Sequence, residues 1–330
     1  EEVPTPGPEI PFAGWTCDEL VPDLCFLGPP EKGHITLHGL KIRYWRFKPT
    51  GNVPSDSDNY PLIVIHGGPA QSHDYMLPLK QHACRGREVI FYDQAGCGSS
   101  DWPNLDADIA VDFPWLLDIN YYTKEELPAL IRHLKLDKYH LLGHSWGTVI
   151  AQVFALDTLP KGLVSMIFSG PMSDARLYNE AQLDPDTGTL RLLPPFIEKR
   201  MRALDRERAH DSDEYLAIDG LFSIIFTSWT VGTRTIPDCV KATFEKTNWF
   251  LYDFLWGPSE IRIDSKSTLY SISTTDRLKY IDVPVLVTSG KYDLMTPKVV
   301  QPFKDSLPYA EFLMLNRSSH ASLIDEPGPM

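Results

Sequence analysis

The stretch Tyr139-His-Leu-Leu-Gly143-His-Ser145-Trp-Gly147, followed by residues 148–159, decides the fold. Its first four residues predict a short buried strand, and residues 148–159 predict a helix. A serine between such a strand and helix lies on a sharp, strained turn, and glycines two positions to either side let the helix pack close to the strand. Gly143 and Gly147 meet this demand. We therefore expect Ser145 to be a nucleophile, with a chance Gly-Ser turn as the alternative.

A serine hydroxyl needs a general base that an acid holds in place before it can attack at neutral pH. The required chain order is Ser, then Asp or Glu, then His, and Ser145, Asp293 and His320 match it. Asp293 and His320 each follow a predicted strand, at the edge where open parallel sheets build their sites. We expect these three residues to form a catalytic triad. Asp325 or Asp305 is the alternative acid. The alternative for His320 is that it is a loop residue without a catalytic role.

An oxyanion hole requires the backbone N–H after the nucleophile and a second N–H from the loop after an early strand. Trp146 supplies the first, and the loop His66-Gly67-Gly68-Pro69 supplies the second. We favour Gly68 over Gly67 as the donor. His66 could act as a second base, but we interpret it as a residue that braces this loop by hydrogen bonding.

Predicted strands alternate with predicted helices along most of the chain, which indicates an α/β fold with a mostly parallel sheet flanked by helices. The first two strands alternate apolar and polar residues around Gly39, as an antiparallel hairpin does. The expected strands are residues 34–38, 40–47, 62–65, 87–92, 139–142, 163–168, 283–290 and 310–315.

The alternation lapses after Gly170, where charge-dense and aromatic helical stretches replace strands, so we expect an inserted helical cap. The chain then divides into an N-terminal arm, a first core part, the cap and a second core part: residues 1–32, 33–170, 171–280 and 281–330. The chain starts at Glu1 and stops at Met330 without the final helix of such a fold. We therefore expect the native start to have been removed and the native protein to continue beyond Met330.

Composition excludes several classes of protein. The 330 residues are 43% hydrophobic, with no apolar run long enough to span a membrane. A formal charge of −13 argues against nucleic-acid or anionic-membrane partners. No targeting signal is legible, and we expect a soluble protein, with the cell interior favoured over secretion. Neither composition nor pattern indicates an oligomeric state.

No metal site or cofactor is predicted, because the sequence has no C-x-x-C pair, no H-E-x-x-H and no P-loop. Gly96-Cys-Gly98 follows a strand, but Asp101 stands where a dinucleotide-binding loop needs its third glycine. Five cysteines form an odd set. Cys17 and Cys25 could pair in an oxidising compartment, although we prefer to interpret them as two free thiols.

Five segments, taken in order, resemble the proline iminopeptidase family of α/β-hydrolases, close to the branch of tricorn-interacting aminopeptidases and L-amino acid amidases. The resemblance runs from about Gly33 to Asp325 and is weakest over residues 173–243. Each motif alone occurs in many hydrolases, whereas the five motifs in this order are specific to the family that the chain resembles. The segments are Leu62-Ile-Val-Ile-His-Gly-Gly-Pro-Ala-Gln-Ser-His-Asp-Tyr75, Phe91-Tyr-Asp-Gln-Ala-Gly-Cys-Gly-Ser-Ser100, Gly143-His-Ser-Trp-Gly147, Gly257-Pro-Ser-Glu260 and Gly290-Lys-Tyr-Asp-Leu-Met-Thr-Pro297.

The resemblance implies a serine aminopeptidase or amidase that releases an N-terminal amino acid, often proline, from short peptides, amides or arylamides through an acyl-enzyme. It also implies that Glu260 anchors the free α-ammonium group of the substrate, with a surface charge as the alternative. Ala70 and Thr148 depart from glycines common in the family. No residue clearly matches the second cap carboxylate of proline-specific members, for which Asp253 and Glu245 are candidates.

Two other functions remain open. The same triad could hydrolyse an ester, a lactone or a secondary-metabolite amide with Glu260 idle, or the chain could be a non-catalytic α/β-hydrolase that binds a small ligand. Aromatic residues of the cap region would form either a pocket wall or the cap core: Trp229, Trp249, Phe250, Tyr252, Phe254 and Trp256.

Overall fold

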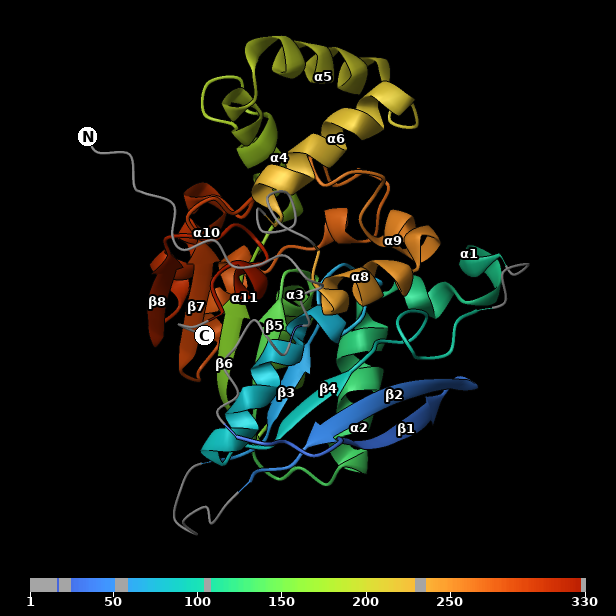
Figure 1. The fold of residues 1–330 in the computed structure, drawn as a ribbon, viewed down its shortest axis with the longest axis vertical. Helices are drawn as coiled ribbons and strands as arrows, with labels where there is room; N and C mark the ends of the chain where they lie inside the picture. The colour runs from blue at the N-terminus through green and yellow to red at the C-terminus, as the bar shows by residue number, and fades with distance from the viewer. Residues whose placement is uncertain (1–16, 18–24, 51–58, 104–107, 229–235, 328–330) are drawn as a thin grey trace.

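The computed structural model describes residues 17, 25–50, 59–103, 108–228 and 236–327, so most of the expected N-terminal arm and Trp229 lie outside the described residues. One eight-stranded sheet with the order β1-β2-β4-β3-β5-β6-β7-β8 forms the centre (Figure 1). The strands are β1 (Glu31–Leu37), β2 (Leu40–Phe47), β3 (Leu62–Ile65), β4 (Val89–Tyr92), β5 (Tyr139–His144), β6 (Leu163–Ser169), β7 (Val285–Gly290) and β8 (Ala310–Leu315).

The sheet is mostly parallel, as the sequence predicts. β1 and β2 pair as an antiparallel hairpin, β2 pairs antiparallel with β4, and the remaining neighbours are parallel. All four residues of β3 and of β4 are buried, because helices cover both faces of a parallel sheet. These buried central strands hold the loops of the candidate site at their carboxyl ends.

Helices flank the sheet in the described part of the chain (Figure 1). Before β5 the chain forms a π-helical turn, η3 (Tyr121–Glu126), that continues into α2. The α-helices of the core are α1 (Ile109–Asp112), α2 (Leu127–His133), α3 (Trp146–Thr158), α10 (Pro297–Ser306) and α11 (Ser322–Asp325), and the short 3₁₀ helices are η1 (Asp74–Arg85) and η2 (Pro114–Leu117).

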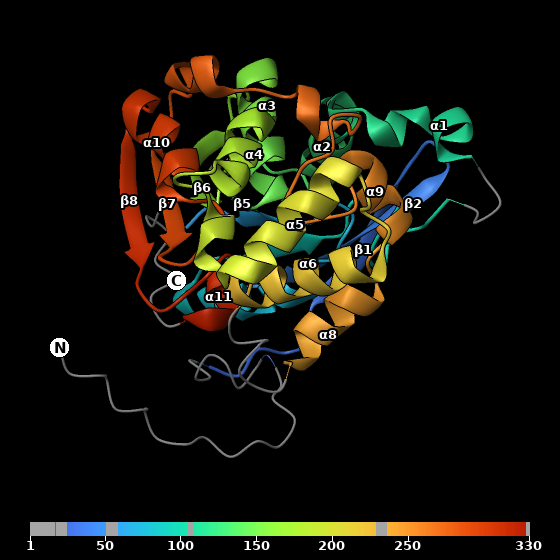
Figure 2. The ribbon, with the colours of Figure 1, turned by 90° about the horizontal axis from the view of Figure 1, so that it is seen from above.

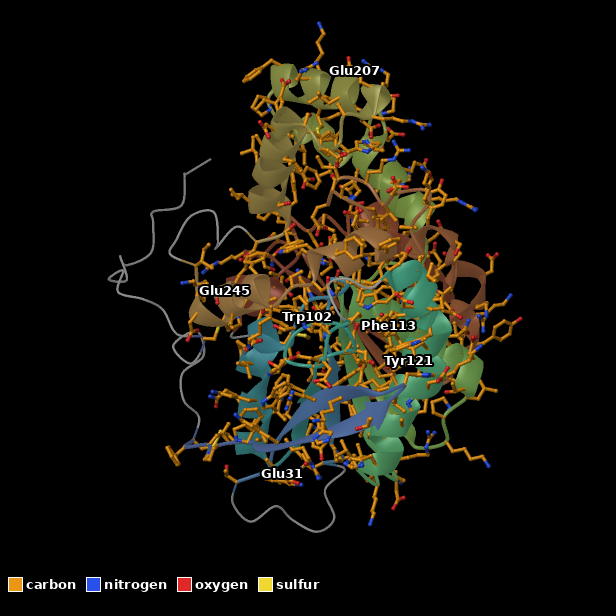
Figure 3. All side chains as sticks on the ribbon, turned by 90° about the vertical axis from the view of Figure 1, so that its right-hand side faces the viewer. Glu31, Trp102, Phe113, Tyr121, Glu207 and Glu245 are labelled. Carbon is orange, nitrogen blue, oxygen red and sulfur yellow. A yellow bond between two sulfur atoms is a disulfide. The ribbon has the colours of Figure 1, made fainter. Side chains whose placement is uncertain are left out.

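Between β6 and β7 the described chain forms helices, which gather at one end of the sheet (Figures 1 and 2). Glu207 lies at the far tip of this helical layer, opposite Glu31 of the sheet (Figure 3). The domain boundaries at residues 33, 171 and 281 stay predictions. The elements are α4 (Ala175–Leu183), η4 (Thr189–Leu192), α5 (Pro195–Glu207), α6 (Asp213–Phe226), α8 (Asp238–Glu245), α9 (Trp249–Leu255), η5 (Leu269–Ser271) and η6 (Thr275–Tyr280).

The disulfide bonds correct the expectation that Cys17 and Cys25 are free thiols. Cys17 is not a free thiol but forms a disulfide with Cys239 at the start of α8, and Cys25 forms one with Cys84 in η1. The partners are 222 and 59 residues apart, a separation that sequence spacing cannot reveal. Cys97 is free and buried.

No helix within the described residues is both long enough and apolar enough to cross a bilayer. Among the same residues, one group has metal-ligand spacing, Cys17, Asp238 and Cys239, but its two sulfur atoms are bonded to each other.

Candidate active site

Ser145 lies on the turn between β5 and α3 with the backbone angles φ 53° and ψ −122°, which is a strained conformation for a residue with a side chain. The flanking glycines are needed for close packing. A Cβ atom on Gly147 would lie 2.2 Å from the carbonyl oxygen of Ile65, and one on Gly143 would lie 2.4 Å from the carbonyl oxygen of Gly147. The predicted strand-turn-helix geometry around Ser145 is therefore confirmed.

His320 follows β8, and its Nδ1 atom lies 2.8 Å from the carboxylate of Asp293, which follows β7. Burial alone would lower the pKa of His320, but the charge and hydrogen bond of Asp293 raise it above its ordinary value. The two alternative acids have other partners. Asp325 accepts hydrogen bonds from Ser319, and Asp305 accepts one from Gln301.

The loop after β3 is braced as expected. The main-chain N–H of Gln94 donates to Nε2 of His66, so Nδ1 of His66 carries the proton and donates to the carbonyl oxygen of Gly67 over 2.8 Å. The N–H of Gly67 donates to the hydroxyl of Tyr75, which removes Gly67 from the expected oxyanion donors. Gly68 lines the cavity that contains Ser145.

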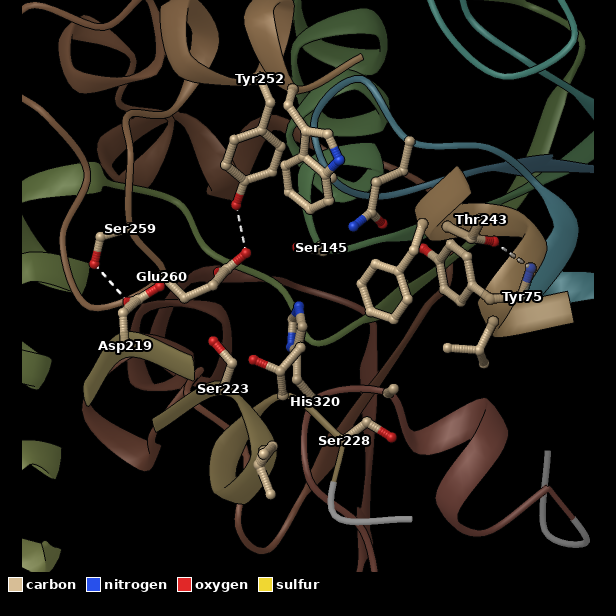
Figure 4. Close-up of a pocket in the computed structure, with 18 of the residues that line it drawn as sticks. Tyr75, Ser145, Asp219, Ser223, Ser228, Thr243, Tyr252, Ser259, Glu260 and His320 are labelled. Carbon is tan, nitrogen blue, oxygen red and sulfur yellow. Dashed lines mark hydrogen bonds between the residues drawn. The ribbon is translucent and has the colours of Figure 1, made fainter. Parts of the chain in front are cut away.

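A cavity of about 560 Å³ brings together the residues predicted from distant parts of the sequence. Ser145, His320 and Glu260 all line it. Figure 4 shows Ser145 between the side chain of Glu260 and the pair Tyr75 and Thr243, with His320 next to the serine. The helices between β6 and β7 thus close the site from above.

The side chain of Glu260 accepts a hydrogen bond from the hydroxyl of Tyr252, and the hydroxyl of Tyr178 donates to its main-chain oxygen. Burial raises the pKa of Glu260 to about 7, against the opposing effect of the Tyr252 hydrogen bond, and the charge of Asp219 raises it further. A carboxylate so placed is costly unless a cation faces it. Glu260 therefore lines the cavity and is not the surface charge that the sequence analysis considered as the alternative.

Asp219 is a site residue that the sequence analysis missed. It lines the same cavity, and its carboxylate lies beside Glu260 (Figure 4) and accepts a hydrogen bond from Ser259 over 2.6 Å. Burial also raises its pKa. The signal was available, because Asp219 interrupts the apolar stripe of α6 formed by Tyr215, Phe222 and Phe226.

Of the two carboxylates expected as a second anchor, Asp253 lines the cavity and Glu245 does not. Glu245 lies on the outer side of α8 (Figure 3), where it pairs with Lys241. Of the two candidates, the structure therefore places only Asp253 at the cavity.

The helix that carries Asp219 also supports the histidine loop. The N–H of His320 donates to the carbonyl oxygen of Phe226, the last residue of α6, and the N–H of Ala321 donates to the next carbonyl oxygen, of Thr227. One helix therefore links the carboxylate end of the cavity to His320.

Comparisons with known proteins agree with this architecture. Residues 60–211 match the model of the alpha/beta hydrolase fold. A proline iminopeptidase of Lactiplantibacillus plantarum is 33% identical over 271 residues, which covers 82% of this chain and 88% of the relative. A proline iminopeptidase of Heyndrickxia coagulans is 32% identical over 296 residues, covering 90% and 94%.

The crystal structure of proline iminopeptidase from Mycobacterium smegmatis superposes with a TM-score of 0.78 at 28% identity, over 90% of this chain and 94% of that one. The sequence similarity extends along most of the chain. The chain is a hydrolase that belongs to the proline iminopeptidase family of α/β-hydrolases.

Proposed function

We propose that the protein is a serine aminopeptidase that releases an N-terminal amino acid, with proline as the first candidate, from short peptides, amides or arylamides. Ser145 is the nucleophile, His320 the general base and Asp293 the acid that orients His320. The N–H groups of Trp146 and Gly68 stabilise the oxyanion. Glu260 and Asp219 hold the α-ammonium group of the substrate.

The reaction has two halves. The Oγ atom of Ser145 bonds to the substrate carbonyl carbon while His320 takes the hydroxyl proton. The tetrahedral intermediate then breaks its carbon–nitrogen bond, and the departing amine receives that proton from His320. Water, deprotonated by His320, attacks the acyl-enzyme and releases the amino acid, and the proton returns to Ser145.

One observation carries this proposal: two carboxylates with raised pKa values line the same cavity as Ser145 and His320. Two adjacent, partly buried acids repel each other when both are charged, and a bound ammonium group removes that penalty. A substrate without the amine leaves the pair uncompensated. The cavity therefore favours acyl groups that carry a free amine.

The test compares prolyl and alanyl p-nitroanilides with p-nitrophenyl acetate, using the wild type, Ser145→Ala, Glu260→Gln and Asp219→Asn. We expect Ser145→Ala to abolish turnover of all three substrates. Each carboxylate variant should lower kcat/KM for the p-nitroanilides by about tenfold to a hundredfold and leave the ester nearly unchanged. Efficient ester hydrolysis without turnover of the free-amine substrates would instead identify an esterase that leaves Glu260 idle. Tight binding without any turnover that depends on Ser145 would identify a non-catalytic binding protein.

We further infer that the chain matures in an oxidising compartment, against the sequence expectation of an intracellular protein. Two disulfides, Cys17–Cys239 and Cys25–Cys84, support this inference, since reducing compartments keep such thiols unpaired.

A further inference from the structure

The cavity is larger than the acyl part of the proposed substrate requires. Its volume of about 560 Å³ lies in the range of pockets that bury drug-sized ligands, whereas the acyl part is a single amino acid. If the ammonium group lies at Glu260 and Asp219 and the carbonyl carbon at Ser145, the rest of the cavity is left for the leaving group. This inference therefore rests on the proposed function.

Besides the carboxylates, the cavity is lined by five large apolar side chains, which come from four helices. Ile224 belongs to α6, Val240 and Phe244 to α8, Trp249 to α9 and Ile324 to α11, and all five line the cavity. We name these five residues the apolar wall. In Figure 4, Thr243 of α8 lies on the side of Ser145 away from Asp219, which places α8 at the leaving-group end.

Three residues of the apolar wall are unusually exposed for their type. The exposed fraction is 45% for Ile224, 41% for Phe244 and 54% for Trp249. The rings of Phe244 and Trp249 are nearly parallel, at 13°, with centroids 6.5 Å apart. A group of large apolar side chains that line one cavity is a surface that a bound apolar group would cover favourably.

Apart from His320, the charged side chains that line the cavity in the described part of the chain are all acidic. Asp211, Asp219, Asp253 and Glu260 line it, and no lysine or arginine does so among the residues that the structure describes. A leaving group with a free carboxylate would meet these negative charges and would find no lysine or arginine partner among the described lining residues. An uncharged leaving group avoids this repulsion.

We propose that the apolar wall is the leaving-group subsite and that it selects bulky, uncharged apolar amines while rejecting free carboxylates. The preferred substrates are then aminoacyl amides of hydrophobic amines and peptides whose next residue is apolar and amidated. Dipeptides with a free carboxyl terminus are poor substrates.

A matched set of three substrates tests the subsite: prolinamide, Pro-Phe-NH₂ and the dipeptide acid Pro-Phe. We expect kcat/KM to be highest for Pro-Phe-NH₂ and at least about tenfold lower for the dipeptide acid. Equal values for the amide and the acid would overturn the proposal. If none of the three substrates shows hydrolysis that depends on Ser145, the proposed function fails first, and the subsite fails with it.

Variants of the wall give an independent readout. Trp249→Ala and Phe244→Ala should each raise KM for Pro-Phe-NH₂ by about fivefold to twentyfold and raise KM for prolinamide much less. The matched control is Tyr309→Ala, which removes an aromatic side chain 61% exposed and outside the cavity lining. Equal losses for both substrates, or no loss for either, would contradict the assignment.

A gain of function completes the test. Ile224→Lys places a cation on the apolar wall, and a lysine at a residue 45% exposed can keep its ammonium hydrated. We expect this variant to reduce the preference for Pro-Phe-NH₂ over the dipeptide acid by about threefold or more. An unchanged preference in a folded variant would show that charge at this wall does not select the leaving group.

Discussion

The Nε2 atom of His144 lies 3.0 Å from the main-chain oxygen of His320, so the residue before the nucleophile contacts the proposed general base directly. On its other side, Nδ1 of His144 lies 2.7 Å from the Tyr75 hydroxyl. That hydroxyl already accepts from the N–H of Gly67 and must donate its one proton to His144. His144 is therefore neutral, accepts at Nδ1 and donates from Nε2 to His320. Burial and the nearby His320 lower its pKa to about 3.

The first prediction concerns this bridge. His144→Phe should lower kcat by about tenfold to a hundredfold with little change in KM, because the loop that holds His320 loses a fixed contact. His144→Gln should restore most of the rate, since its amide can accept from Tyr75 and donate to His320 as the imidazole does. Steady-state kinetics of both variants, with thermal melting to confirm folding, check this. A glutamine variant as impaired as the phenylalanine variant would show that His144 serves packing alone.

The second prediction is a pH dependence. Because the pKa of Glu260 is raised to about 7, the group is largely protonated below that pH and loses its attraction for an ammonium group. The ratio of kcat/KM for prolyl p-nitroanilide to that for p-nitrophenyl acetate should therefore fall as the pH drops from 8 to 6. Titration of His320 affects both substrates and cancels in the ratio. In Glu260→Gln the ratio should be nearly flat over this range, and a wild-type ratio that rises on acidification would refute the assignment.

The third prediction addresses the turn of Ser145. Gly147→Ala should lower the free energy of unfolding by more than about 3 kcal/mol, because the added methyl would collide with the backbone of Ile65. Gly220→Ala is the control, since no atom lies within 4 Å of the corresponding methyl position on α6. That change should stabilise the protein by about 0.5–1 kcal/mol. Urea denaturation measures both, and a tolerated Gly147→Ala would contradict the close packing of β3 and α3.

The fourth prediction concerns the disulfides. Unfolded protein that has not been reduced should show one reactive thiol, that of Cys97, and reduced protein should show five. Cys17→Ser should lower the free energy of unfolding by about 2–4 kcal/mol, because the bond to Cys239 closes a long loop in the unfolded chain. Thiol titration in denaturant and urea denaturation give these values. Five reactive thiols without reduction would rule out both bonds.

The features that the sequence predicted correctly are those determined by residues adjacent in the chain. The strand at Ala310–Leu315 was predicted with its observed bounds, and the turn at Ser145 with its observed geometry, because both follow from adjacent residues. The partners of Cys17 and Cys25 could not be read, since nothing near them in sequence specifies Cys239 or Cys84. The break that Asp219 makes in the apolar stripe of α6 is visible in the sequence, but its role at the cavity depends on which elements α6 packs against.

The central claim is that Ser145 acts on acyl groups whose free amine is held by Glu260 and Asp219. The most direct measurement compares kcat/KM for prolyl p-nitroanilide and N-acetylprolyl p-nitroanilide in the wild type and in the Glu260→Gln/Asp219→Asn double variant. We predict a wild-type preference for the free amine on the order of a hundredfold or more, and a double variant that loses most of it. Comparable wild-type turnover of the acetylated substrate would contradict the claim.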